Sequence, residues 1–154
     1  MRRDKLKVVV PAADAAESAP YVLDEQVGFL LRVAMQRHTS IFTARMTEAL
    51  TQTQFAALSK LYEVGPCSQN YLGRLIYLDA ATIKGVVDRL SVRGFLTALN
   101  DPKDRRRRAV ALTDRGRQVT EEAIKVAAEI TAATLAPLTA EEQRTVTRLL
   151  KTLG

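Results

Sequence analysis

The side chains most suited to chemistry form a run of four arginines, Arg105–Arg108, with Asp101 and Asp104 close by. Each guanidinium offers a planar fork of N–H donors that matches phosphate oxygens and base edges, and a narrow minor groove attracts it electrostatically. We expect one of Arg105 and Arg106 to enter a minor groove and the other to be braced by one of the two aspartates. The residues leave open which arginine does which.

A β-hairpin is the element that must present these arginines. Phe95–Leu99 is strand-like, Asn100-Asp101-Pro102 has the composition of a turn, and an alternating segment leads back to Leu112. Because side chains alternate along a strand, only one of Arg107 and Arg108 is expected to face a bound polyanion. The hairpin is therefore expected to act as a wing with a cationic tip.

The net charge of the chain is concentrated around this hairpin. The whole chain carries +6, from 23 Lys+Arg against 17 Asp+Glu. Between Lys84 and Arg117 there are ten basic and four acidic residues, so this window alone accounts for the excess. A focused basic patch is the electrostatic signature of a protein that binds a polyanion.

Two short helices are predicted directly before the hairpin. Ser68 is a suitable cap for a helix over 69–77, and Asp79 for a second helix over 80–93 that ends at a left-handed Gly94. Two helices followed by a wing predict a winged helix-turn-helix, whose second helix enters the major groove of DNA.

The second helix has candidate DNA-reading residues in its first turns. Thr82 can contact a thymine methyl or a base edge, whereas Lys84 is a point charge for phosphate. Gly85 permits either close approach to the backbone or helix packing, and a core helix with a polar outer face is the alternative for the whole segment. The complete set of candidate DNA-binding residues is Ser68, Gln69, Ala81, Thr82, Lys84, Arg89, Lys103, Arg105, Arg106 and Arg107, with Asp101 and Asp104 as wing braces.

Long helices are predicted on both sides of this region. Apolar residues recur at three and four over 22–49, Thr51-x-x-Gln54 caps a helix that ends at Gly65-Pro66, Thr113-Asp114 starts a helix that Pro137 breaks, and Thr139-x-x-Glu142 starts the last one. Their apolar stripes exceed what the middle of the chain can cover, so we expect a symmetric dimer held by the terminal helices.

The predicted fold class is mainly α with a small β-hairpin. We expect a flexible arm over 1–20, an N-terminal dimerisation helix over 21–50, the winged helix-turn-helix over 51–112 and C-terminal dimerisation helices over 113–154.

Motifs spread along this order of elements resemble the MarR family of bacterial transcriptional regulators. They are Leu50-Thr51-x-x-Gln54-Phe55-x-x-Leu58, Gly65-Pro66-x-Ser68-Gln69-x-x-Leu72, Asp88-Arg89-Leu90-x-x-Arg93-Gly94-Phe95, and Asp101-Pro102-x-Asp104-Arg105-Arg106-x-x-x-Val110-x-Leu112-Thr113-x-x-Gly116. The resemblance implies an obligate dimer on a pseudo-palindromic operator of double-stranded DNA, usually a repressor, released by a small aromatic ligand. The stretches 61–75 and 79–87 resemble repressors of aromatic-acid catabolism.

The resemblance also implies a ligand cleft between the first, second and fifth helices. His38, Phe42 and Arg45 follow at i, i+4 and i+7 and share a helix face, which suits an aromatic carboxylate. The candidate ligand-binding residues are Arg32, His38, Phe42, Arg45, Phe55 and Tyr62. The alternative is a dimer-interface His38 beside an ordinary surface arginine. A free aromatic acid and its CoA thioester are both open; Arg32, Arg37 and Arg2-Arg3 suit the thioester.

The few reactive residues argue against other classes of protein. One His and one Cys make no catalytic dyad and no metal cluster, so we expect no enzyme, metal or cofactor. Cys67 excludes an intramolecular disulfide; it is expected to fill a Gly-Pro-Cys-Ser turn, with a helix N-terminus lowering its pKa. A repressor switched by Cys67, an architectural DNA-binding protein without effector and a protein-interaction module are the alternatives. With no apolar run of membrane-spanning length, we expect a soluble, cytoplasmic, nucleoid-associated bacterial protein.

Overall fold

The computed structural model describes residues 20–100 and 108–154. Within them, side-chain caps set the starts of five of the longer helices. The elements are η1 (Leu23–Glu25), α1 (Val27–Arg45), η2 (Thr47–Ala49), α2 (Gln52–Val64), α3 (Gln69–Leu75), α4 (Ala80–Val92), β1 (Leu96–Asn100), β2 (Arg108–Leu112), α5 (Asp114–Leu135) and α6 (Ala140–Leu153). Capping boxes start α2 and α6, and single side-chain caps start α3, α4 and α5, as predicted.

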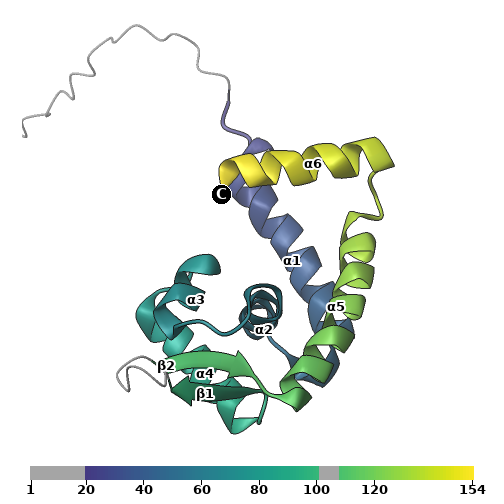
Figure 1. Cartoon of the computed structure of the whole chain (residues 1–154). Coiled ribbons are helices and arrows are strands. Elements are labelled where there is room, and N and C mark those ends of the chain that lie inside the picture. Colours follow the sequence, from purple (N-terminus) through teal and green to yellow (C-terminus); the bar gives the residue numbers. More distant parts are fainter. Residues whose placement is uncertain (1–19, 101–107) are drawn as a thin grey trace, which may run out of the picture.

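The winged helix-turn-helix is formed by α2, α3, α4 and the β1–β2 hairpin (Figure 1). The two strands are antiparallel, with Leu96 opposite Leu112 and Asn100 opposite Arg108. The loop before α3 adds a third strand position, because Cys67 and Val110 exchange backbone hydrogen bonds of 3.2 and 2.8 Å. The predicted mainly α fold with one small hairpin is confirmed.

The prediction of one continuous helix over 22–49 is wrong. The helix is interrupted at Gln26 and again at Met46, both of which have extended backbone. The chain must turn sharply after Met46, because Met46 and Leu50 both enter the core. The helix predicted over 69–77 is shorter than expected. Helix α3 ends at Leu75, and Tyr77 adopts a left-handed φ of 58° before α4 begins.

The core lies under the winged helix-turn-helix and along one face of α5. Apolar side chains of α1 to α5 and of both strands contribute to it, whereas α6 contributes none. The largest fully buried side chains are Phe95, Leu58, Leu72, Ile83, Leu90, Ile130, Val86 and Thr120.

The terminal helices extend away from this core. Helices α1 and α5 lie side by side, and α6 folds across near the N-terminal end of α1 (Figure 1). No side chain of α6 is buried. Among the described residues no single helix is long and apolar enough to cross a membrane; α5 and α6 meet that criterion only as a pair, across a bend of 107°.

Candidate DNA interface and effector cleft

The N-terminal turns of α4 present a fixed face to solvent. Ile83, Val86 and Leu90 are buried against the core, which leaves Ala81, Thr82 and Lys84 exposed on the opposite side. The spacing follows from the helical period, since the buried residues recur at three and four. The exposed face also carries the positive end of the helix dipole, which favours an anion.

Two of the candidate DNA-binding side chains have partners within α4. Asp79 accepts from the Thr82 backbone N–H at 2.8 Å and from its hydroxyl at 2.9 Å, and these bonds lower the pKa of Asp79. Lys84 Nζ lies 2.5 Å from Asp88 Oδ2, with both side chains exposed. An exposed pair of this kind is worth little, so Lys84 is free to exchange it for a phosphate.

Ser68, Gln69 and Arg89 lie around this face. Ser68 Oγ accepts from the Tyr71 N–H at 3.2 Å and is exposed, and Gln69 is half-buried at the first position of α3. The exposed Arg89 lies over Gly85: a Cβ built on Gly85 would meet Arg89 Nη1 at 3.3 Å, with no other residue nearer. Gly85 therefore does not make room for a neighbouring helix, and its open surface faces Arg89.

The tip of the wing lies outside the described residues. This applies to the candidates Lys103, Arg105, Arg106 and Arg107 and to the braces Asp101 and Asp104. The described base of the wing ends at the Asn100–Arg108 pair, where Arg108 is exposed.

The base of the wing is tightly joined to α5. The Phe95 carbonyl accepts from the Thr113 N–H at 3.0 Å, and a Cβ on Gly116 would lie 1.9 Å from that same carbonyl oxygen. Only glycine permits this approach. The Thr113 hydroxyl completes the joint by donating to the Gly94 carbonyl at 2.6 Å.

His38 projects from α1 towards α5 and lies at one end of a row of aromatic rings. Thr134 donates its hydroxyl hydrogen to the Ile130 carbonyl at 2.8 Å, and its Oγ1 lies 3.0 Å from His38 Nδ1, so this threonine of α5 also orients the His38 ring. The ring centroids of His38 and Phe42 are 6.1 Å apart, and those of Phe42 and Phe55 are also 6.1 Å apart.

Two hollows flank this row. One, of about 410 Å³, is lined by His38, Thr131, Thr134, Leu135, Val146, Thr147, Leu150 and Lys151. The other, of about 450 Å³, is lined by Thr39, Phe42, Thr43, Met46, Ala49, Leu50, Thr51, Gln52 and Thr53. Thr134 and Lys151 were not among the predicted residues, because neither carries a local pattern that relates it to His38.

The six candidate ligand residues are thus only partly brought together. His38, Phe42 and Phe55 form one row. Arg45 is exposed and lines neither hollow, and the guanidinium of Arg32 lies 5.0 Å from the centre of the Phe29 ring. Tyr62 donates to Glu121 Oε1 at 3.1 Å, and Arg117 lies over its ring at 5.3 Å.

Cys67 differs from its prediction. Partial burial raises the pKa of the Cys67 thiol, whereas a helix N-terminus was expected to lower it. The thiol is held at the edge of the hairpin, where desolvation dominates because it disfavours the thiolate. Within 20–100 and 108–154, no group of three or more His, Cys, Asp or Glu side chains is placed to hold a metal.

Comparisons with known proteins match both the sequence and the fold. A model of the MarR family matches residues 50–107. The HTH-type transcriptional repressor NicR of Pseudomonas putida is 38% identical over 146 residues, which cover 94% of this chain and 92% of that protein. A crystal structure of a probable transcriptional regulator from Pseudomonas aeruginosa shares 49% identity with a TM-score of 0.83, covering 86% of this chain and all (100%) of its own. A structure of Bordetella bronchiseptica BpsR, described as showing how 6-hydroxynicotinic acid regulates its DNA binding, shares 39% identity with a TM-score of 0.81, covering 87% and 96%.

Proposed function

Because this chain belongs to the MarR family of transcriptional regulators, we propose that it is a dimeric, ligand-responsive repressor of an operon for aromatic-acid catabolism. The observation that carries the proposal is the exposed, capped N-terminal face of α4 beside a joined wing, within the basic window of the chain. Membership of the family makes the chain a regulator and not an enzyme.

DNA binding divides between the helix-turn-helix, α3 and α4, and the wing. Ala81 and Thr82 read base edges in the major groove, while Lys84, Arg89, Ser68 and Gln69 contact phosphates. One of Arg105 and Arg106 enters the flanking minor groove and the other pairs with Asp101 or Asp104, which brace the wing, while Lys103 and Arg107 contact the DNA nearby.

Dimer formation explains the exposed apolar side chains of the terminal helices. Leu149, Leu150 and Leu153 on α6 and Val27, Leu30 and Leu31 on α1 are all exposed in the single chain. Burial against a second copy removes this surface from water. The proposed organisation is accordingly an arm over 1–20, the DNA-binding region over 51–112 and dimerisation helices over 21–50 and 113–154.

The effector is a small aromatic acid, and the site is the row of His38, Phe42 and Phe55. The aromatic rings contact its ring, and the His38 imidazole forms a hydrogen bond with its polar group. The regulation of BpsR by 6-hydroxynicotinic acid supports this chemical class. The two recognition helices of the dimer fit DNA only at one spacing. A ligand that binds more tightly to the dimer at another spacing therefore lowers the affinity for DNA.

The operator is tested by footprinting on the DNA upstream of the gene. A two-fold dimer predicts an inverted repeat with half-site centres about 10 bp apart. If six or more phosphates are contacted, log affinity falls with log salt with a slope of about −5 or steeper. Protection of a direct repeat contradicts the symmetric dimer, and a shallow slope contradicts the electrostatic argument.

The effector is tested by release of that DNA with 6-hydroxynicotinic acid, a panel of aromatic acids and their CoA thioesters. Thr134→Val keeps the volume but removes the bond that orients His38, so it should reduce the response to the effector without changing DNA affinity. Thr152→Val is the matched control, since it loses a similar hydroxyl-to-carbonyl bond without a histidine partner. Equal responses in all three proteins would place the effector elsewhere.

A further inference from the structure

The turn between α1 and α2 has an unusual backbone. Glu48 and Ala49 both adopt left-handed conformations, with φ of 54° and 47°, although neither is glycine. This region is unfavourable for residues with a Cβ, and it persists only where the surroundings hold it. The turn therefore depends on contacts from outside it.

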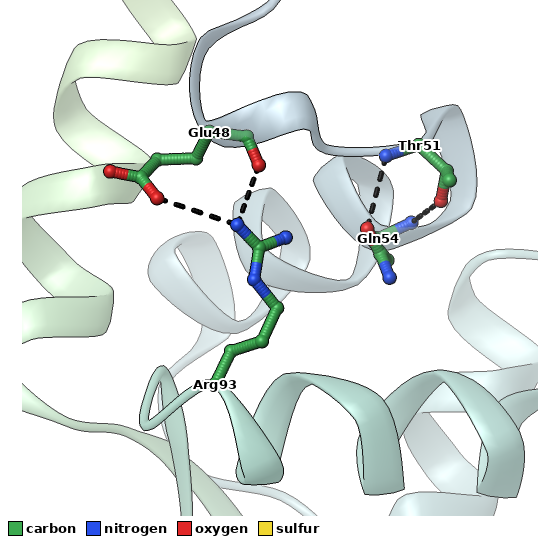
Figure 2. A network of polar contacts seen from close by, with 4 residues as sticks. All are labelled: Glu48, Thr51, Gln54 and Arg93. Atoms are coloured by element: carbon green, nitrogen blue, oxygen red, sulfur yellow. Dashed lines mark hydrogen bonds and ion pairs between the residues drawn. The ribbon is translucent and has the colours of Figure 1, made fainter.

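Arg93 supplies such a contact from the end of α4. Its Nη2 donates to the Glu48 backbone carbonyl at 2.5 Å and lies 3.4 Å from Glu48 Oε2, as Figure 2 shows. The guanidinium also lies over the Phe95 ring, 4.6 Å from its centre. The side chain is 31% exposed, so these bonds are partly shielded from water.

The same turn forms a wall of the 450 Å³ hollow between α1 and α2. Ala49, Leu50 and Thr51 line it directly after Glu48, facing Phe42 and Met46 across the space. Gln52 Nε2 donates to Thr39 Oγ1 at 3.0 Å and joins the two helices at the same place. The turn bonded to Arg93 through Glu48 thus also contributes Ala49 to the lining of this hollow.

The opposite end of α4 carries the proposed base-reading residues. A helix of 13 residues is about 20 Å long and rigid, so a small rotation at its C-terminal end displaces its N-terminal end. Helix α4 is bonded to the turn at its C-terminal end, while Ile83 packs its N-terminal half on the core and the base-reading residues on the opposite face stay exposed.

We propose that Arg93 is a positioning residue that fixes the angle of the recognition helix relative to the α1–α2 turn. The affinity for specific DNA then depends on the conformation of Glu48 and Ala49. This inference rests on the proposed function, because it assumes that α4 reads DNA. It adds a role for a residue that itself contacts no DNA.

The test compares Arg93→Gln with wild type on the footprinted operator and on random DNA. Loss of a hydrogen-bonding charge is expected to weaken operator binding about tenfold or more, while binding to random DNA changes less than about threefold. The salt slope should stay that of wild type, because no phosphate contact is lost. Arg93→Lys, which keeps the charge, should restore part of the affinity.

Two further variants are matched controls. Glu48→Gln should bind like wild type, because the shorter bond goes to the backbone carbonyl. Arg115→Gln removes one charge from the same basic window and the same Phe95 ring, at 5.2 Å, but no bond to Glu48, so it should weaken binding to operator and to random DNA by the same factor. The melting temperature of each variant identifies unfolding; should Arg93→Gln unfold, Arg93→Lys carries the comparison.

The outcomes separate the two proposals. If wild type does not bind its operator, the proposed function fails and this inference fails with it. If wild type binds and the folded Arg93 variants bind equally well, only the inference is overturned. A shallower salt slope in Arg93→Gln would also overturn it, because it would make Arg93 a phosphate contact.

Discussion

The winged helix-turn-helix and the terminal helices differ in how far their apolar side chains are buried. In the first region Leu58, Leu72 and Leu90 are fully buried (0% exposed) within one chain. In the second, Leu150 and Leu153 are 49% and 72% exposed, although α6 has a regular apolar stripe. The first region buries these side chains within a single chain, whereas the second leaves its apolar stripe exposed, as the proposed dimer requires. Stability and assembly should therefore respond to different substitutions.

The largest effect is expected at the junction of the two regions. Gly116→Ala places a Cβ 1.9 Å from the Phe95 carbonyl, so the wing or α5 must shift, at an estimated cost above about 4 kcal/mol. Chemical denaturation measures this loss in the free energy of unfolding. Gly85→Ala is the matched control: its Cβ meets only the flexible end of Arg89, and the helix should gain about 0.5–1 kcal/mol. Equal stability of the two variants would contradict the close approach.

A matched pair of leucines tests the comparison directly. Leu58→Ala removes a fully buried side chain (0% exposed) and should cost about 2–5 kcal/mol of the free energy of unfolding. Leu150→Ala, at a residue 49% exposed, should cost less in the single chain and shift the monomer–dimer equilibrium instead. Sedimentation at several protein concentrations distinguishes the two. The comparison breaks down if Leu58→Ala alters assembly and Leu150→Ala only alters unfolding.

Deleting residues 138–154 tests whether dimerisation can be lost without loss of the DNA-binding region. The shortened chain should be monomeric or aggregated, and its operator affinity should fall at least about 100-fold because two linked half-sites become independent. Circular dichroism should still show the remaining helices. A truncated protein that stays a well-behaved dimer would disprove the role given to α6.

The smallest effect concerns acid pH. Hydrogen bonds from Thr82 hold the pKa of Asp79 below its ordinary value of 3.8, and bonds from Thr139 hold the pKa of Glu142 below its ordinary 4.5. Each carboxylate therefore stabilises the folded state above its ordinary pKa, and this contribution is lost as the pH falls through the lowered value. Asp79→Asn should flatten the pH dependence of unfolding between pH 4 and its lowered pKa, while Glu142→Gln should affect α6 and assembly. An unchanged curve for both would contradict these caps.

Local signals account for what could be predicted from the sequence. Helix starts can be predicted at Thr51, Asp79 and Thr139, because a capping side chain accepts a hydrogen bond from the backbone N–H only three residues later. The wing and the recognition helix follow from such signals. The α1–α2 turn could not be predicted, since Glu48 and Ala49 are not residues that favour a left-handed backbone.

Contacts between residues far apart in the sequence could not be predicted either. His38 and Thr134 are 96 residues apart, and Cys67 pairs with Val110 without any motif in common. The predicted direction of the Cys67 pKa shift was wrong for the same reason. Cys67 is partly buried where it pairs with Val110 of β2, and no local sequence pattern indicates that pairing. The row of His38, Phe42 and Phe55 consists of three candidate ligand residues: His38 and Phe42 share one helix face, and Phe55 was included through the family resemblance. That this row binds an effector stays a prediction.

The paired base of the wing has a consequence for how the protein can diversify. Five registered pairs from Leu96–Leu112 to Asn100–Arg108, anchored by the Phe95–Gly116 contact, fix both ends of the segment between them. The separation of Asn100 and Arg108 is therefore set by the base of the hairpin and not by the residues that connect them. We expect substitutions in the connecting segment to alter DNA binding while the free energy of unfolding stays that of the wild type.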